Sequence, residues 1–200
     1  MDDKPRDVVA QVTKTGLLFV LDRDTGKPVL AVEERPVPQG GVAGEYLSPT
    51  QPFPAVTPPI VPHRLTPDDA FGITWFDERG CRKQIEESVS EGIFTPPSEI
   101  GTLIYPFTGG GANWGGAAYD PNRNLLVINM NNLAHHVMLI PADQLGEMEE
   151  VLHDQEVSPQ TGAPFGVTRK VLMSARGARG LFAPLARPDR GNGAVGPETV

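Results

Sequence analysis

Glycine and proline interrupt this chain so often that a fold built from long helices is excluded first. Its 200 residues include 22 glycines and 21 prolines. Proline lacks the backbone N–H that helices and central strands use, and glycine loses more conformational freedom on folding than any other residue. This composition predicts short strands joined by many turns, within a length typical of one domain.

Short apolar runs separated by turn residues predict strands in two parts of the chain. The first group comprises residues 7–12, 17–21 and 28–32. The second group comprises residues 102–105, 116–119, 125–130 and 137–140. The junctions are Thr15-Gly16, residues 24–27 and residues 120–124, and Asp or Gly there provides the positive φ of tight hairpins. Each group is therefore predicted to form an antiparallel meander.

Four other segments break this pattern. Eight prolines between residues 36 and 62 remove strand donors, which predicts an extended connector. The segment Thr66-Pro67-Asp68-Asp69 combines a hydroxyl cap, a proline and first-turn acids, and predicts a short helix beginning there. A second short helix is predicted at 142–153. Beyond Met173, Arg, Gly and Pro recur without alternation, which predicts disorder over 174–200.

Two strand-rich units of three or four short strands, separated by a long proline-bearing insertion, are typical of β-propeller blades rather than of a closed sandwich. Periodicity alone leaves this choice open. The predicted fold class is all-β, a partial β-propeller with a long proline-rich insertion and short helices.

Charge and cysteine content exclude several functions. There are 17 Lys and Arg residues against 25 Asp and Glu residues, a formal net charge of −8, which argues against nucleic acid as a partner. The single cysteine, Cys81, excludes an internal disulfide and a cysteine-based zinc site. The chain contains neither an apolar run long enough to span a bilayer nor the apolar core of a signal peptide.

The most unusual segment is the glycine-rich run from Gly109 to Gly116, which contains Asn113 and Trp114. Glycines let a flat ligand approach the backbone, asparagine offers donors and an acceptor, and tryptophan offers a broad apolar face. The run therefore suits a planar cofactor that bears carbonyl groups. The alternative is a glycine-rich loop with a tryptophan in the core. It is not a phosphate loop, because it lacks GxGxxG order and a following Lys-Ser/Thr.

Lys14 lies at a junction between a predicted strand and a turn, within a stretch that is otherwise apolar and β-branched. A lysine there can neutralise a ligand carboxylate or stabilise a reduced quinone oxygen, and a solvated surface lysine is the alternative. Arg23 is expected to pair with Asp22 or Asp24.

The remaining ionisable residues do not assemble a complete catalytic set. His135 and His136 are adjacent, and neighbours on a strand point to opposite faces, so they are not expected to bind one metal. No serine lies in a GxSxG elbow, and Cys81 lacks a recognisable cysteine-hydrolase context. Acids such as Glu86 and Glu87 lie in polar runs that predict solvated helix faces.

Three motifs occur in order along the chain. The first is Lys-Pro-Arg-Asp-Val-Val at 4–9, followed by Thr13-Lys14-Thr15-Gly16 and Phe19-Val20-Leu21-Asp22-Arg23. The second is Phe94-Thr95-Pro96-Pro97-Ser98-Glu99, and the third is the run 109–116 with Asp120-Pro121. From about Asp3 to about Met173, this order resembles the quinoprotein dehydrogenases, above all the membrane-bound glucose/quinate/shikimate family that depends on pyrroloquinoline quinone (PQQ).

The resemblance implies an eight-bladed propeller with PQQ on its axis. Such proteins oxidise a sugar or polyol by hydride transfer to PQQ on the periplasmic side of the inner membrane, and pass electrons to ubiquinone. By resemblance, Lys14 matches the lysine that hydrogen-bonds the quinone oxygens and Asn113 matches an asparagine at the cofactor. Trp114 would be a neighbouring cofactor-binding residue.

The chain departs from the family in what it lacks. In the family, the aspartate base, the calcium or magnesium ligands and the membrane anchor precede the lysine motif. We therefore expect no catalytic base and no metal ligand here, and read residues 1–173 as an internal fragment of two or three blades, inactive alone. The arginine- and glycine-rich stretch 174–200 suggests a truncated gene product, frameshifted near residue 174.

The sequence leaves two alternatives open. One is a non-catalytic periplasmic β-propeller that serves as a binding or assembly scaffold, although the lysine and the Asn-Trp motif argue against it. The other is complementation, in which another chain supplies the missing blades and the base. Glucose, quinate, shikimate and other polyols are not distinguished as substrates, because loops from several blades determine specificity.

Overall fold

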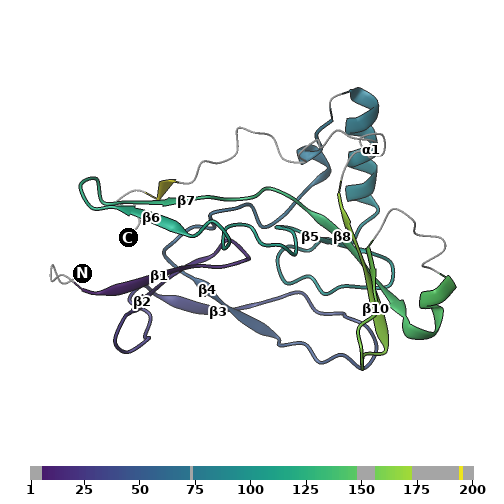
Figure 1. Cartoon of the computed structure of the whole chain (residues 1–200), viewed down its shortest axis with the longest axis horizontal. Helices are drawn as coiled ribbons and strands as arrows, with labels where there is room; N and C mark the ends of the chain where they lie inside the picture. The colour runs from purple at the N-terminus through teal and green to yellow at the C-terminus, as the bar shows by residue number, and fades with distance from the viewer. Residues whose placement is uncertain (1–5, 73, 148–155, 173–193, 196–200) are drawn as a thin grey trace.

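The computed structural model describes residues 6–72, 74–147, 156–172 and 194–195. Within them, short strands dominate and α-helix is sparse (Figure 1). The strands are β1 (Val8–Val12), β2 (Leu18–Asp22), β3 (Val32–Pro36), β4 (Thr50–Pro54), β5 (Thr102–Ile104), β6 (Ala117–Asp120), β7 (Leu125–Ile128), β8 (His135–Pro141), β9 (Glu156–Ser158), β10 (Phe165–Val171) and β11 (Ala194–Val195). The helical elements are α1 (Trp75–Glu86) and two 3-10 turns, η1 (Pro67–Asp69) and η2 (Ala142–Gln144). The all-β prediction with short helices is confirmed.

The strands form four antiparallel sheets. The largest has the order β5-β8-β10-β9, and the sheet that contains the β6–β7 hairpin has the order β11-β7-β6. The other two are ribbons, β1-β2 and β3-β4. The second predicted meander is therefore wrong, because β5 pairs with β8 and the β6–β7 hairpin lies in another sheet. In Figure 1, α1, β8 and β10 lie at the end of the molecule opposite to the β6–β7 turn and the start of β1. The hairpin turn predicted at 120–124 is confirmed, with Asp120 Oδ1 accepting the backbone N–H of Asn122 at 2.9 Å.

The strand predicted at 28–32 is wrong. Beyond Asp22, the β1–β2 ribbon gains only an isolated bridge between Leu21 and Pro28 and a hydrogen bond from Val29 N to Val20 O. Pro28 has no N–H with which to extend the ladder. The Ala31 carbonyl instead accepts Ala55 N at 2.8 Å, so the chain turns toward a different partner and β3 begins at Val32.

The proline-rich connector contains a strand, β4, which the proline count did not predict. Bonds from Ala55 N to Ala31 O and from Val37 N to Pro49 O mark which positions of the β3–β4 ribbon are hydrogen-bonded. Pro36, Pro52 and Pro54 all lie at the alternate positions of the register, where a strand residue directs its N–H away from its partner. Prolines at this spacing therefore cost the ribbon no hydrogen bond.

The helix predicted to begin at Thr66 is a single 3-10 turn, Pro67–Asp69. Thr66 occupies the predicted cap position, and the Asp69 carboxylate accepts its backbone N–H at 2.9 Å and its hydroxyl at 2.7 Å. At Ala70 the backbone leaves the helical region, with ψ 136°. The Thr-Pro-Asp-Asp segment therefore forms a helical turn, but this turn does not extend into a longer helix.

Helix α1 lies outside the predicted helices, although it begins with the same chemistry. The Asp77 N–H donates to Thr74 Oγ1, and the Asp77 carboxylate accepts the Thr74 backbone N–H at 3.2 Å. Cys81 and Ile85, four residues apart on one face, are buried. Burial raises the pKa of the Cys81 thiol, which favours the neutral form. Glu86 and Glu87 are exposed, as predicted.

The C-terminal predictions are tested only in part. Residues 142–147 are helical, and the rest of the predicted helix 142–153 lies outside the described residues. Strands β9 and β10 were not predicted. Apart from Ala194 and Val195, the segment predicted to be disordered, 174–200, also lies outside them.

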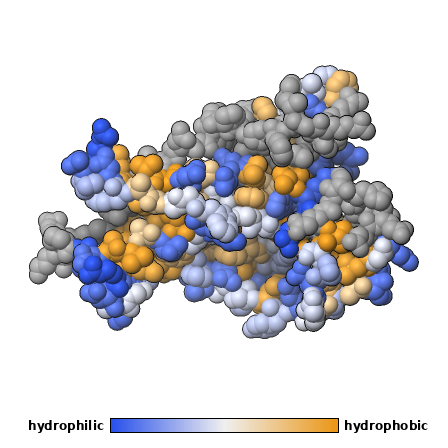
Figure 2. Space-filling view, viewed as in Figure 1, coloured by the Kyte–Doolittle hydropathy of each residue, from blue (hydrophilic) through white to orange (hydrophobic). Residues whose placement is uncertain are grey.

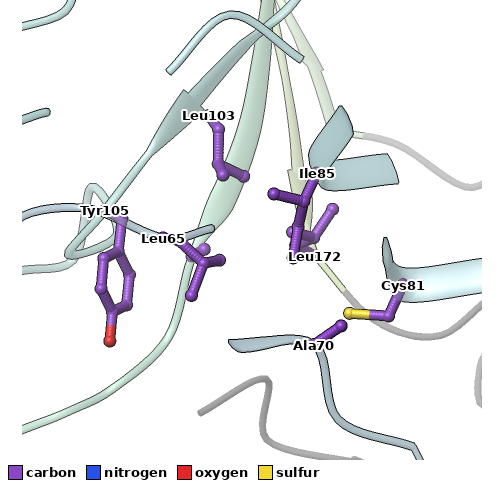
Figure 3. Packing of buried hydrophobic residues seen from close by; sticks show 8 residues of the cluster. Leu65, Ala70, Cys81, Ile85, Leu103, Tyr105 and Leu172 are labelled. Atoms are coloured by element: carbon purple, nitrogen blue, oxygen red, sulfur yellow. The ribbon is translucent and has the colours of Figure 1, made fainter. Parts of the chain in front are cut away.

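Two clusters of buried apolar side chains form the core. The first packs α1 against the sheet that contains β5 and comprises Leu65, Ala70, Cys81, Ile85, Leu103, Tyr105, Ala134 and Leu172 (Figure 3). The second joins the β1–β2 hairpin to β7 and comprises Val12, Leu18, Val20, Leu30, Ile60, Ala112 and Ile128. Because Ala112 belongs to the glycine-rich run, the second cluster packs this run against the hairpin.

Some apolar side chains remain on the surface. Figure 2 shows apolar and polar residues interspersed, with apolar residues gathered near the β1 and β6–β7 end. Val8 and Val9 of β1, Tyr119 of β6 and Val127 of β7 are exposed there. Contiguous exposed apolar surface commonly marks a place where further protein packs.

We expect Gly16→Ala to destabilise the fold more than Gly26→Ala. Both glycines have positive φ, +70° and +69°, so both substitutions strain the backbone. A Cβ at position 16 would also overlap the Val61 side chain, whereas nothing lies within 4 Å of a Cβ at position 26. Urea denaturation should show a loss of about 1 kcal/mol for Gly26→Ala and about 2–4 kcal/mol for Gly16→Ala. Equal losses would mean that Gly16 does not pack against Val61.

Candidate functional site

Lys14 lies at the tip of the connection between β1 and β2. Thr13 N donates to Leu17 O and Gly16 N donates to Thr13 O, both at 3.0 Å, and together they close the turn. Gly16 takes the positive φ that this turn requires. The Lys14 side chain is exposed, and the turn that carries it is rigidly hydrogen-bonded.

The segment at 60–63 supports this turn from outside the hairpin. Ile60 N donates to Gly16 O, and His63 Nε2 lies 2.9 Å from Thr15 O. Val61 packs directly against Gly16. The end of the proline-rich connector therefore packs against the turn at residues 13–17, which we call the lysine turn, and stabilises it.

The glycine-rich run is held by backbone hydrogen bonds on two sides. Phe107 N donates to Leu133 O at 2.9 Å, before the run, and Asn131 N donates to Gly111 O. Gly111 N donates to the carbonyl oxygen of Lys14 at 2.7 Å. The run thus lies between the lysine turn and the connection from β7 to β8.

Lys14, Asn113 and Trp114 converge around Gly110. The Lys14 Nζ atom lies 5.8 Å from the centroid of the Trp114 ring. A Cβ at Gly110 would overlap Asn113 Oδ1 and lie 3.1 Å from Lys14 Cγ. All three residues predicted from the sequence are therefore neighbours, and the absence of a side chain at Gly110 makes room for the Asn113 amide oxygen beside Lys14.

The Asn113 side chain contains a buried oxygen without a hydrogen-bond donor. Asn113 Oδ1 has no partner in the structure, and a buried amide oxygen in that state costs free energy unless a ligand or water supplies a donor. This unpaired acceptor fits a planar ligand with a ring N–H near it.

Trp114 is not a core tryptophan. Its side chain is 76% exposed, and its indole N–H donates to Gly109 O. The alternative of a glycine-rich loop around a buried tryptophan is therefore wrong. The indole instead presents an open apolar face beside the Lys14 ammonium.

Two neighbours of this site carry no signal in the sequence pattern. The Thr108 carbonyl accepts Lys14 Nζ at 3.5 Å, and Thr108 Oγ1 lies 2.8 Å from His135 Nδ1. Neither pairing could be found from spacing, because the three residues come from separate segments. Arg23 pairs with Asp24, as predicted, and at 2.7 Å with Asp7, which was not predicted.

His135 and His136 contact different parts of the structure, as neighbours on a strand should. His135 reaches Thr108, whereas His136 lines a cavity of about 330 Å³ together with Gln84, Ser88 and Lys170. Burial, and then the Lys170 charge, lower the pKa of His136. The described residues contain no group of three or more His, Cys, Asp or Glu side chains placed to hold a metal ion.

Comparison with known proteins identifies similar chains. A family model described as "PQQ: Glucose/ethanol/alcohol dehydrogenase, beta-propeller domain" matches residues 1–188. The predicted partial β-propeller is thereby confirmed. No solved structure matches the chain.

Three curated relatives illustrate the range of similar proteins. Quinoprotein glucose dehydrogenase of Escherichia coli (strain K12) is 39% identical over 180 residues, 85% of this chain and 22% of the relative. Glycerol dehydrogenase large subunit of Gluconobacter oxydans (strain 621H) is 38% identical over 82% of this chain and 23% of its own length. Quinate/shikimate dehydrogenase (quinone) of Acinetobacter baylyi is 35% identical over 87% of this chain and 22% of its own length. The chain thus spans less than a quarter of these relatives.

Among the described residues, no helix has the length and apolar character needed to cross a membrane.

We expect the stability of the lysine turn to depend on pH through His63. Burial lowers the pKa of His63 below its ordinary 6.5, and the hydrogen bond with Thr15 opposes this more weakly. The unfolded chain therefore binds more protons than the folded chain just below pH 6.5, and the free energy of unfolding falls as the pH drops through that range.

Urea denaturation at pH 7.5 and 5.5 checks this expectation with His63→Gln, whose amide N–H can still donate to Thr15 O. Between the two pH values, the unfolding free energy of the variant should decrease less than that of the unmodified chain, by up to about one half. The remaining decrease comes from His136, whose pKa is also lowered in the folded chain. An unchanged decrease in the variant would show that His63 does not carry the effect.

Proposed function

Because the chain belongs to the PQQ-dependent glucose/ethanol/alcohol dehydrogenase β-propeller family, we propose that it forms part of a sugar or polyol dehydrogenase. Lys14, Asn113 and Trp114 line one side of the proposed PQQ site. The observation that carries this proposal is the convergence of the three side chains around Gly110. The chemistry of the three groups agrees with the chemistry of the cofactor.

The residues present fit a flat quinone that carries carboxylates. The Lys14 ammonium complements quinone oxygens or a carboxylate, and the unpaired Asn113 Oδ1 can accept a ring N–H. The exposed Trp114 indole offers a planar ring system an apolar face. The absence of a side chain at Gly110 makes room for Asn113 Oδ1 and for the aliphatic part of Lys14.

When bound, PQQ supplies the acceptor for the hydride of the alcohol carbon. Lys14 would hold a positive charge beside the quinone oxygens and would stabilise the negative charge that develops there. Asn113 orients the ring system through its amide. Trp114 excludes water from one face of the site.

The proposal extends to the whole protein of which such a chain is a part. The relatives are named for glucose, glycerol and quinate or shikimate, so the proposed substrate is a sugar or polyol. Electron transfer to ubiquinone, a calcium or magnesium ion, and a location on the periplasmic side of the inner membrane belong to the same proposal. We assign no catalytic base or metal ligand to the described residues, and propose that the chain alone does not oxidise sugars.

Binding of PQQ by this chain tests the proposal. Titration with PQQ in the presence of calcium, followed by tryptophan fluorescence and cofactor absorbance, should show saturable binding. Lys14→Met should raise Kd about tenfold or more, the loss expected for one charge-assisted hydrogen bond. Lys27→Met, which removes an exposed lysine from the turn after β2, is the matched control and should bind like the unmodified chain.

Two outcomes would contradict the proposal. One is the absence of saturable binding by the folded chain. The other is an equal effect of Lys14→Met and Lys27→Met, because this would show that the cofactor responds to net charge rather than to Lys14.

A further inference from the structure

The Thr108 side chain connects the glycine-rich run to the largest sheet. Thr108 Oγ1 lies 2.8 Å from Nδ1 of His135, the first residue of β8. The pairing is separate from the backbone bonds that hold the run, and none of the groups proposed to contact the cofactor takes part in it.

His135 is a fixed anchor for this contact. It pairs with Ile104 of β5 on one side and with Val171 of β10 on the other, so its backbone lies inside the four-stranded sheet. The Phe107 ring packs edge-on against the imidazole, with ring centroids 5.0 Å apart and planes at 86°. Thr108 therefore bonds to a side chain whose position the sheet determines.

Two successive carbonyls beyond this anchor hold two of the proposed cofactor-binding side chains. Thr108 O accepts Lys14 Nζ at 3.5 Å, and Gly109 O accepts the Trp114 indole N–H. The distance to Lys14 is at the long limit for a hydrogen bond, so a small rotation of the peptide after Thr108 would break it. Gly109 has no side chain that could resist this rotation. The contact between Thr108 and His135 resists it instead.

We propose that the hydrogen bond between Thr108 and His135 is a positioning contact for Lys14. It fixes the start of the glycine-rich run on β8, so that the Thr108 carbonyl stays directed toward the Lys14 ammonium. Thr108 and His135 are positioning residues, since they act through Lys14. The consequence for PQQ rests on the proposed function: an ammonium held in advance stabilises developing negative charge without reorganising.

Chemical reactivity of Lys14 tests the inference without any cofactor. The folded chain is acylated briefly with a water-soluble active ester, and mass spectrometry gives the rate at Lys14 relative to Lys27 in the same molecule. Thr108→Val removes the hydroxyl at nearly constant size, frees Lys14 and should raise this ratio about two- to fivefold, the change expected for one weak hydrogen bond. Thr108→Ser keeps a hydroxyl and should leave the ratio unchanged.

A second pair of variants tests the other end of the contact. His135→Leu should raise the ratio as Thr108→Val does, and His135→Asn, whose amide can replace Nδ1, should restore it. In the double variant Thr108→Val with His135→Leu, the two effects should not add. Equal Lys14-to-Lys27 ratios in Thr108→Val and Thr108→Ser would overturn the inference. If Thr108→Val does not fold, equal ratios in His135→Leu and His135→Asn would overturn it.

PQQ titration of the same variants separates this inference from the proposed function. If both hold, Thr108→Val weakens PQQ binding several-fold and Thr108→Ser does not. If the unmodified chain binds no PQQ, the proposed function fails, while the Lys14-to-Lys27 ratio still decides whether Thr108 and His135 position Lys14.

Discussion

The hydrogen bond from Gly111 N to Lys14 O joins the hairpin β1–β2 to the glycine-rich run, and the candidate site depends on it. Ala112, the next residue of the run, is buried in the core cluster that contains Val12 and Leu18 of the hairpin. Backbone pairing and apolar burial therefore fix the same two segments together. Without this junction, Lys14 and Trp114 would be unrelated surface residues.

The site is one-sided, and its electrostatics agree with that geometry. An exposed ammonium and an exposed indole face outward, while a single amide oxygen is buried without a donor. Exposed apolar residues of β1, β6 and β7 add to the surface that the described residues leave uncovered. In a closed propeller, blades around a central axis cover such surfaces. A chain that spans 22% of a relative is consistent with one part of that arrangement.

Local chemistry allowed much of the fold to be predicted from sequence. Alternation and turn residues located β1, β2, β5, β6, β7 and β8, and the lysine and Asn-Trp motifs predicted three residues that the structure brings together. The β4 strand was missed because the number of prolines was considered without their spacing. Pro36, Pro52 and Pro54 all lie at alternate strand positions, where the backbone N–H is not needed for pairing. The Thr108–His135 contact was beyond sequence reasoning, because it depends on how β8 lies beside the glycine-rich run.

Nuclear Overhauser effects between the Lys14 side chain and the α protons of Gly110 test the central claim most directly. In the isotope-labelled chain, the 3.1 Å approach of a Cβ position at Gly110 to Lys14 Cγ predicts strong cross-peaks. The Gly111 amide, which donates to Lys14 O, should be protected from hydrogen exchange. Absent cross-peaks together with a Gly111 amide that exchanges as in an unfolded peptide would contradict the account.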